Sequence, residues 1–288
     1  MEQKGISILL PTRGRKEVLK KSLESLLNKA DNPNDLEILF GVDEDDQEVS
    51  DYIKDVIAPI LKEKGVEGRA NIFKPLGYEN LHVYVNTLAG SSTGKWMFFW
   101  NDDCLMESEG WVTEIRKYDG QFKLLGPKDN HDGHPYAILP IVPNDWFILM
   151  GHLSQNAQND AWLSHIAYML DIFERIDISF IHDRADITGN NDDETFQNRK
   201  YMEGNPNDPK DFGHVDMQNA RVNTAHKIAW FLEKIGQKSE WWDKVKAGDQ
   251  DPFEKMVWKE GVKGAGQLAA VPGEDEKPEL PDDHKLVL

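Results

Sequence analysis

Polar residues with the chemistry of a metal and phosphate site follow several apolar segments of the chain. They are Thr12, Arg13, Arg15, Asp43, Asn101, Asp102, Asp103 and His182. Carboxylate and imidazole groups suit Mn²⁺ or Mg²⁺, and such ions commonly keep open positions for the phosphates of a substrate. Arginine guanidinium groups suit phosphate or a nucleotide base. The residue types therefore predict a site that binds a divalent metal ion together with a nucleotide.

Short apolar runs precede most of these residues and predict buried strands. The runs cover residues 6–10, 36–42, 95–100 and 178–181. Between the first two, leucines at helical spacing predict a helix over residues 16–29. Repeated strand–helix–strand units predict an α/β fold, with a mostly parallel sheet and helices on both faces. Ligands of such sheets bind beyond the carboxyl ends of the strands, so the candidate residues should meet at one edge.

The second half of the chain has a different pattern. Two apolar runs, at residues 136–142 and 146–150, predict strands joined by a turn. An apolar stripe predicts a helix over residues 160–173, and two further helices are expected at 215–235 and 240–245. These elements would complete the sheet and extend it with helices at the carboxyl-terminal side.

Composition divides the chain into four parts. Residues 1–183 form the expected α/β domain, and residues 215–262 form a helical extension. Between them, the polar stretch 184–214 is expected to be a mobile loop or lid, since loops this long usually have such a role. Residues 263–288 are acidic and contain several prolines, which predicts a disordered tail.

The charge balance excludes several classes of protein. The chain has 33 Lys and Arg against 51 Asp and Glu, a net charge of −18. Such a surface repels nucleic-acid backbones and anionic lipid heads, so no nucleic-acid partner is expected. No run is long enough for a membrane span, and the segment before Pro11 is too short for a signal peptide. With a single cysteine, Cys104, these features predict a cytoplasmic protein.

Three segments, in this order, carry a resemblance to a known family. They read ISILLPTRGRKEVLKKSLESLL, LEILFGVDEDD and FFWNDD. Together they resemble glycosyltransferases of the GT-A fold, specifically the family 2-like group, over about residues 5–183. The resemblance implies a Rossmann-like α/β domain that binds a nucleotide-sugar. It also implies that Thr12, Arg13 and Asp43 hold the base and ribose, with Arg15 and Asp102 completing the donor site.

The family's Asp-x-Asp motif, which binds the divalent cation, falls on Asn101, Asp102 and Asp103. Asn101 departs from that motif because it offers a neutral carbonyl oxygen instead of a charge. Either Asp103 carries the metal with Asp102 assisting, or the affinity for metal is weaker than usual. The resemblance places His182 where a histidine completes the metal sphere. A hydrogen-bonded histidine without a metal is the alternative.

The resemblance also implies a general base at the start of a helix that faces the acceptor, and Asp160 stands there. A helix dipole keeps such a carboxylate ionised, as a base requires. The alternative is that Asp160 only caps the helix. Trp146 is a candidate to stack on an acceptor sugar, whereas Trp162 lies on an apolar stripe and is expected in the core.

The function implied is metal-dependent, inverting transfer of a hexose from a nucleoside diphosphate donor, with UDP favoured, to a hydroxyl of a glycan, lipid or protein acceptor. Two alternatives stay open. A sugar-phosphate nucleotidylyltransferase would carry a glycine-rich loop after the first strand, where this chain has only Gly14. A non-catalytic relative that binds a nucleotide or glycan would explain Asn101.

Overall fold

The computed structural model describes residues 4–130, 135–182 and 208–250. Most of the loop expected at 184–214, and the whole of the tail expected at 263–288, lie outside these ranges. Eight strands form one sheet in the order β3-β2-β1-β4-β7-β6-β8-β5. They are β1 (Ile6–Pro11), β2 (Leu36–Asp43), β3 (Glu67–Phe73), β4 (Trp96–Phe99), β5 (Cys104–Met106), β6 (Leu124–Lys128), β7 (Ile141–Pro143) and β8 (Phe173–His182).

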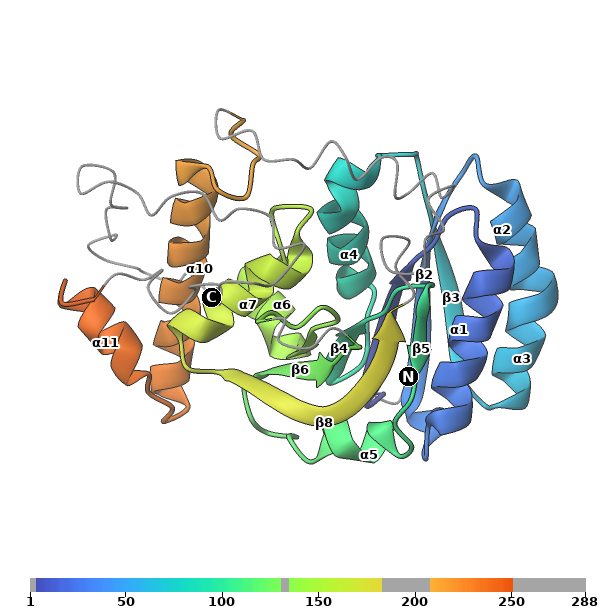
Figure 1. Ribbon diagram of the computed structural model, residues 1–288, viewed down its shortest axis with the longest axis horizontal. Coiled ribbons are helices and arrows are strands. Elements are labelled where there is room, and N and C mark those ends of the chain that lie inside the picture. The colour runs from blue at the N-terminus through green and yellow to red at the C-terminus, as the bar shows by residue number, and fades with distance from the viewer. Residues whose placement is uncertain (1–3, 131–134, 183–207, 251–288) are drawn as a thin grey trace.

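The direction of the strands changes halfway across the sheet. Strands β3, β2, β1 and β4 are parallel, as the strand–helix units predict. Strand β7 then runs antiparallel to β4 and to β6, and β5 runs antiparallel to β8. The α/β fold class is confirmed, with the parallel arrangement complete only in the first half. Strand β8 pairs with β6 at one end and with β5 at the other, and Figure 1 shows it as a long, strongly curved strand.

Helices cover both faces of the sheet. On one face lie α1 (Lys16–Lys29), α2 (Gln47–Tyr52), α3 (Ala58–Glu63) and α5 (Trp111–Arg116), and a π-helical turn, Ile53–Ile57, joins α2 to α3. On the other lie α4 (Leu81–Gly90), α6 (Asn144–Met150), α7 (Asn159–Met169), α10 (Val215–Lys234) and α11 (Glu240–Lys246) (Figure 1).

Two apolar cores result because neighbouring residues of a strand face opposite sides of the sheet. On β1, Ile8 and Leu10 belong to the core under α1, whereas Leu9 belongs to the core under α4 and α7. All three are at most 1% exposed. The first strand is therefore buried on both faces, which is why its sequence is a continuous apolar run.

Residues 146–150 form helix α6 and not the strand that the sequence predicts. Pro143 precedes the helix with extended backbone, and Gly151, with φ of 70°, ends it in the left-handed region. Only the turn signals at the two ends separate such a short apolar run from a strand. Trp146 is fully buried and stacks on Phe122, with ring centroids 5.8 Å apart. The proposed stacking of Trp146 on an acceptor sugar is therefore wrong.

Helix α7 ends at Met169, four residues before the predicted end at 173. Asp171 has φ of 57°, a left-handed conformation that interrupts the helix, and Phe173 begins β8. Trp162 is fully buried, which confirms its place in the core. Strands β5 and β6 and helix α5 are absent from the sequence-based prediction because each is short.

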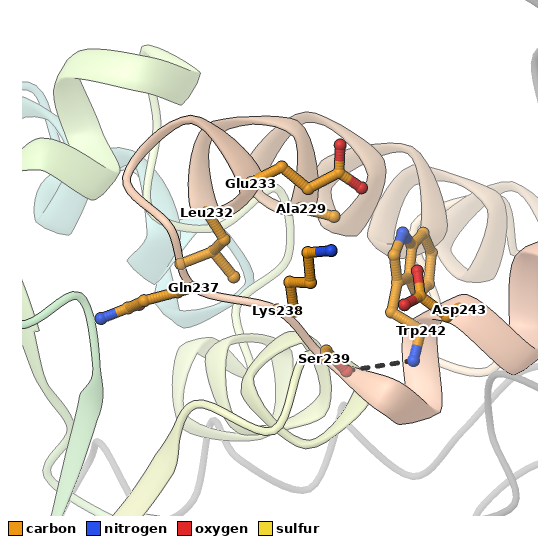
Figure 2. Close-up of a pocket in the computed structure, with 8 residues that line it drawn as sticks. All are labelled: Ala229, Leu232, Glu233, Gln237, Lys238, Ser239, Trp242 and Asp243. Carbon is orange, nitrogen blue, oxygen red and sulfur yellow. Dashed lines mark hydrogen bonds between the residues drawn. The ribbon is translucent and has the colours of Figure 1, made fainter.

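Helices α10 and α11 pack together at the carboxyl-terminal end of the described chain. Ser239 caps α11 by accepting a hydrogen bond from the backbone N–H of Trp242, at 3.0 Å. Figure 2 shows Trp242 and Leu232 lining a small pocket between the two helices. This pocket contains none of the residues predicted to bind the metal ion or the donor. Within residues 4–130, 135–182 and 208–250, no helix is long and apolar enough to cross a membrane.

A buried carboxylate, Glu37, links the amino-terminal ends of neighbouring strands at the edge of the sheet opposite the candidate site. Glu37, on β2, is 1% exposed and accepts hydrogen bonds from the Ser7 hydroxyl and the Thr93 N–H, each at 2.5 Å. It also pairs with Arg69 on β3. Burial raises the pKa of Glu37, but the hydrogen bonds and the charge of Arg69 outweigh it, so that the pKa lies below its ordinary value.

Candidate metal and nucleotide site

Strand pairing brings the candidate residues to one edge of the sheet. Because β1 and β2 are parallel, with Pro11 opposite Gly41, the segments that follow them leave the sheet on the same side. Strand β4 is also parallel to β1, and the turn after it contains Asn101, Asp102 and Asp103. The antiparallel pairing of β5 with β8 then sets Cys104 directly opposite His182. The register of the paired strands therefore brings the candidate metal-binding residues together.

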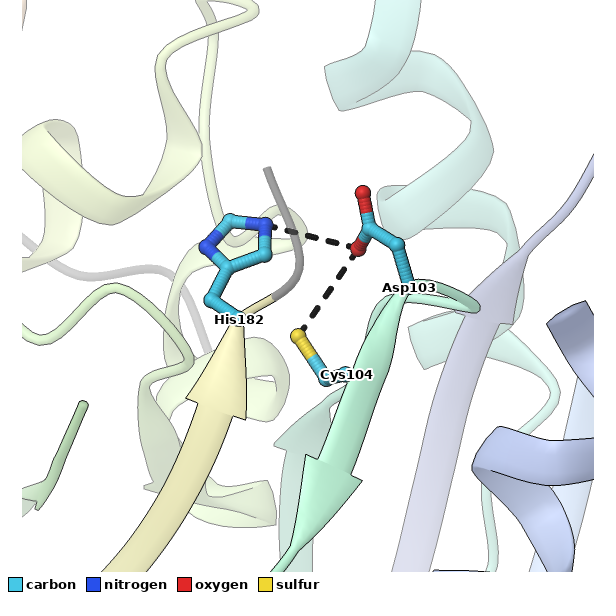
Figure 3. A group of neighbouring side chains, drawn as sticks. All are labelled: Asp103, Cys104 and His182. Atoms are coloured by element: carbon cyan, nitrogen blue, oxygen red, sulfur yellow. Dashed lines mark hydrogen bonds and ion pairs between the residues drawn. The ribbon is translucent and has the colours of Figure 1, made fainter. Parts of the chain in front are cut away.

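Asp103, Cys104 and His182 form a compact group of metal-binding side chains. The Nε2 atom of His182 lies 3.4 Å from Oδ1 of Asp103, and the Cys104 thiol donates to the same oxygen at 3.8 Å. Figure 3 shows the imidazole and the thiol both directed at this carboxylate. In the described ranges this is the one set of three such residues whose ligand atoms lie within 4.8 Å of one another.

The electrostatics of the group keep Asp103 in its anionic form. Burial raises the pKa of this carboxyl, but the hydrogen bond and charge of His182 and the charge of Arg15 outweigh it and lower the pKa. Burial, together with the neighbouring Asp103 and Asp102, raises the pKa of the Cys104 thiol. An ionised carboxylate beside an imidazole is a suitable donor set for a divalent cation.

The group fits the metal ion that the GT-A resemblance implies. Asp103 and His182 are only 18% and 11% exposed, yet both reach the surface. The Nδ1 atom of His182 is buried and has no hydrogen-bond partner among the described residues. Asn101 makes its hydrogen bonds through its backbone carbonyl, which accepts from the Ser22 hydroxyl at 3.2 Å and from the Cys104 N–H at 3.2 Å. Its part in metal binding stays a prediction.

Asp102 faces away from this group and toward the loop after β1. It is 1% exposed, and its Oδ2 accepts a hydrogen bond from the Thr12 hydroxyl at 2.7 Å. Its Oδ1 pairs with Arg15. Thr12 and Asp102 therefore hold the loop after β1 against the turn after β4. Direct contact of either with a donor stays a prediction.

Arg15 also contacts Asp103, with Nη1 3.2 Å from Oδ2. Its side chain is 22% exposed, so one part is fixed by the two carboxylates and another part reaches solvent. A guanidinium group held in this way next to a metal-binding carboxylate is well placed for phosphate oxygens.

A second ion-pair network lies beyond β2. Arg13 donates to Asp43 at 2.8 Å and to both oxygens of Asp45, at 2.5 and 3.0 Å. The hydrogen bond with Asp45 is the main reason that the pKa of Arg13 is raised. The other oxygen of Asp43 accepts a hydrogen bond from the Tyr84 hydroxyl. Burial and this hydrogen bond raise the pKa of Tyr84 to about 12. The structure thus brings Arg13 and Asp43 together, as the resemblance implies.

Four residues at this edge of the sheet were not predicted from the sequence. Tyr84 lies on α4 beside Val85. Its hydroxyl group is the one polar group on an otherwise apolar stripe, and this was the one feature of the sequence that could have indicated a role at the site. Asp45 and Asp46 belong to an acidic run, and Asp46 accepts a hydrogen bond from the Gly14 N–H at 2.7 Å. Cys104 could not be predicted as a site residue because a lone buried cysteine ordinarily behaves as a small apolar residue.

Asp160 is the second residue of α7, which corrects the view of it as the helix cap. The N-cap is Gln158, and no side chain caps this helix. Burial and, after it, the charge of Asp160 raise the pKa of Tyr136. The Tyr136 hydroxyl in turn lies 2.8 Å from Nε2 of the buried His165. In the described part of the chain, no hydrogen bond or ion pair joins Asp160 to the Asp103 group, and its role as a base stays a prediction.

Known proteins resemble this chain in fold. No protein-family model and no curated protein matches the sequence. Among solved structures, Staphylococcus aureus TarS matches 82% of this chain with a TM-score of 0.50 and 15% identity. The mannosyltransferase PcManGT from Pyrobaculum calidifontis, in complex with GDP-Man and Mn²⁺, matches 86% of this chain and 80% of its own, with a TM-score of 0.50 and 9% identity.

These similarities identify the architecture. The chain has a GT-A-like glycosyltransferase fold, which confirms the resemblance found in the sequence. The match spans 44% of the TarS chain, so TarS contains a large part that has no counterpart here.

Proposed function

We propose that this chain transfers a hexose from a nucleoside diphosphate donor to an acceptor hydroxyl, in a reaction that requires Mn²⁺ or Mg²⁺. The observation that carries the proposal is the Asp103–His182 pair beside Arg15, at the carboxyl edge of the sheet of a GT-A-like fold. The similarity to a mannosyltransferase whose structure contains GDP-Man and Mn²⁺ supports this reading of the site.

The residues of the edge divide into two parts in this proposal. Asp103 and His182 would hold the metal ion, with Asn101 as a further ligand. The bound ion would supply positive charge that stabilises the diphosphate as it leaves. Arg15 would bind phosphate oxygens, because its guanidinium is already fixed beside Asp103.

Donor selection would take place beyond β1 and β2. Arg13 and Asp43 would contact the base and ribose of the donor, with UDP as the favoured nucleotide. Thr12 and Asp102 would keep the loop after β1 in position through their hydrogen bond. The cytoplasmic location expected from the single cysteine, Cys104, is part of the same proposal.

Asp160 would act as the general base of an inverting reaction. It lies in the first turn of α7, where the helix dipole favours the ionised form that a base requires. It would take the proton from the hydroxyl of a glycan, lipid or protein acceptor. Packing of α7 into the core would keep the carboxylate in a fixed position.

One observation favours a second candidate, a relative that binds the donor without turnover. Asp102 is paired with Thr12 and Arg15, and Asn101 is neutral, so Asp103 is the one carboxylate of the turn that faces His182. A single carboxylate would hold the cation less tightly than two would, and the cation is what stabilises a leaving diphosphate. Turnover separates this candidate from the transferase, whereas binding does not.

The test of the proposed function is thermal unfolding with UDP and with GDP, each in Mn²⁺ and in EDTA, followed by turnover of the matching nucleotide-hexose. We expect the nucleotide to stabilise the protein more in Mn²⁺ than in EDTA. A ligand at 100 times its dissociation constant adds about 2.7 kcal/mol. The variant Asp103→Asn should lose the effect of Mn²⁺. The matched control is Asp177→Asn, which changes an exposed carboxylate on the same strand as His182. No shift with either nucleotide would contradict the proposal.

A further inference from the structure

The sulfur of Cys104 takes part in the metal group, although the proposed reaction gives it no role. Cys104 is fully buried and is the first residue of β5. Its thiol contacts the oxygen of Asp103 that also faces His182. Most buried free cysteines contact apolar neighbours only. Here the sulfur, the imidazole nitrogen and the carboxylate oxygen converge, as Figure 3 shows.

The two separations from the Asp103 oxygen are close to those around a tetrahedral metal ion. Zinc lies about 2.0–2.3 Å from oxygen, nitrogen and sulfur ligands, so neighbouring ligand atoms around it are about 3.3–3.7 Å apart. The nitrogen of His182 is 3.4 Å from Oδ1 of Asp103, and the sulfur of Cys104 is 3.8 Å from the same oxygen. The first separation lies within this range, and the second exceeds it by about a tenth of an ångström. The third separation, between the nitrogen of His182 and the sulfur of Cys104, is within 4.8 Å.

The chemistry of the three ligands favours thiophilic ions. Thiolate sulfur selects borderline and soft ions such as Zn²⁺ and Co²⁺, whereas Mg²⁺ prefers oxygen alone. Three protein ligands also leave a fourth position of a tetrahedral ion open, as in catalytic zinc sites. We propose that Cys104 is a third protein ligand of this site, which therefore binds Co²⁺ and Zn²⁺ through sulfur and holds them more tightly than Mg²⁺. This inference rests on the metal site of the proposed function and adds the identity of its third ligand.

The test is a titration of the full chain with Co²⁺ in the absence of nucleotide, followed by absorption. Thiolate bound to Co²⁺ gives a charge-transfer band in the near ultraviolet. Because Cys104 is the one cysteine in the sequence, such a band in the unmodified protein assigns the ligand without any substitution. We expect the band to appear, to saturate at one Co²⁺ per chain, and to disappear when Zn²⁺ is added. Binding of Co²⁺ without the band, or no binding at all, would overturn the proposal.

Substitutions sharpen the result. Cys104→Ser should abolish the band and weaken Zn²⁺ binding by at least about tenfold, while His182→Gln should weaken binding and keep sulfur ligation. Asp177→Asn is the control and should bind as the unmodified chain does. If Cys104→Ser does not fold, Cys104→Ala and the unmodified spectrum still decide the matter. Equal Zn²⁺ affinity of Cys104→Ser and the unmodified chain would count against a sulfur ligand.

The outcome is separate from that of the proposed function. A cobalt–thiolate band without any stabilisation by UDP or GDP would support Cys104 as a metal ligand and contradict the proposed transferase function. Nucleotide binding that depends on Mn²⁺, without a cobalt–thiolate band, would leave the transferase and remove Cys104 from the site.

Discussion

Arg15 donates a hydrogen bond to the Asp103 carboxylate at 3.2 Å, across 88 positions of the sequence. The same guanidinium pairs with the buried Asp102. One side chain at the start of α1 thus contacts both carboxylates of the turn after β4. Asp102 has this cation as its partner in the interior, while Asp103 keeps an oxygen directed at His182.

This relationship predicts that Arg15 is essential for stability. Arg15→Gln would leave the buried Asp102 carboxylate without its cation, and the free energy of unfolding should fall by about 3–5 kcal/mol. Urea unfolding at neutral pH measures this. The control, Lys29→Gln, removes an ion pair with Glu109, which is 73% exposed, and should change little. Equal changes in the free energy of unfolding would show that the buried ion pair stabilises the protein no more than the exposed one.

Asp160 allows a test of the general base with a closely matched control. Asp160→Asn should lower turnover by about 10²–10⁴-fold, because an amide cannot accept the acceptor proton. Donor binding should be unchanged. Asp145 is likewise the second residue of a helix that begins with asparagine, but it is exposed. Asp145→Asn should keep full activity in the same steady-state assay. Full activity of Asp160→Asn would show that another residue is the general base.

The pH dependence of stability should carry a contribution from Glu37. Its folded pKa lies below the unfolded value of about 4.3. The stability that it contributes is therefore complete above that pH and is lost as the pH falls through the folded pKa. At pH 7 we expect Glu37→Gln to unfold more easily by about 1–3 kcal/mol. The difference from the unmodified chain should shrink toward pH 3.

The control for this series is Glu67→Gln. Glu67 is the register partner of Glu37 on β3, but its side chain is 53% exposed. Urea unfolding between pH 3 and pH 7 should show little difference between Glu67→Gln and the unmodified chain. A constant deficit of Glu37→Gln across the whole range would mean that the charge of Glu37 contributes nothing.

Trp146 should behave as a core residue. Because it is fully buried against Phe122, Trp146→Ala should lower the free energy of unfolding by about 3–5 kcal/mol. Trp241, which is only half-buried, provides the comparison, and Trp241→Ala should cost clearly less. Intact stability of Trp146→Ala, with weaker acceptor binding, would restore the sugar-stacking interpretation.

Elements whose apolar pattern extends over their whole length can be predicted from the sequence, and shorter ones cannot. Strand β1 and helix α1 were predicted with nearly their observed bounds, because their apolar spacing extends over whole elements. The run at 146–150 was not, because five apolar residues fit a strand and a helix equally well. The residues of the candidate site differ in the same way. Residues that directly follow strands were found, whereas the place of Cys104 depends on the register of β5 against β8, which no local pattern encodes.

The order in which the two cores close during synthesis follows from the position of α10 in the chain. The core under α1 is built from residues no later than Phe180. The opposite core needs Val222 and Ile228 of α10 and Val245 of α11. A chain emerging from the ribosome can thus complete one face of the sheet while the other still exposes its apolar side chains. Within the described residues, that exposed face is covered only when α10 and α11 have been made.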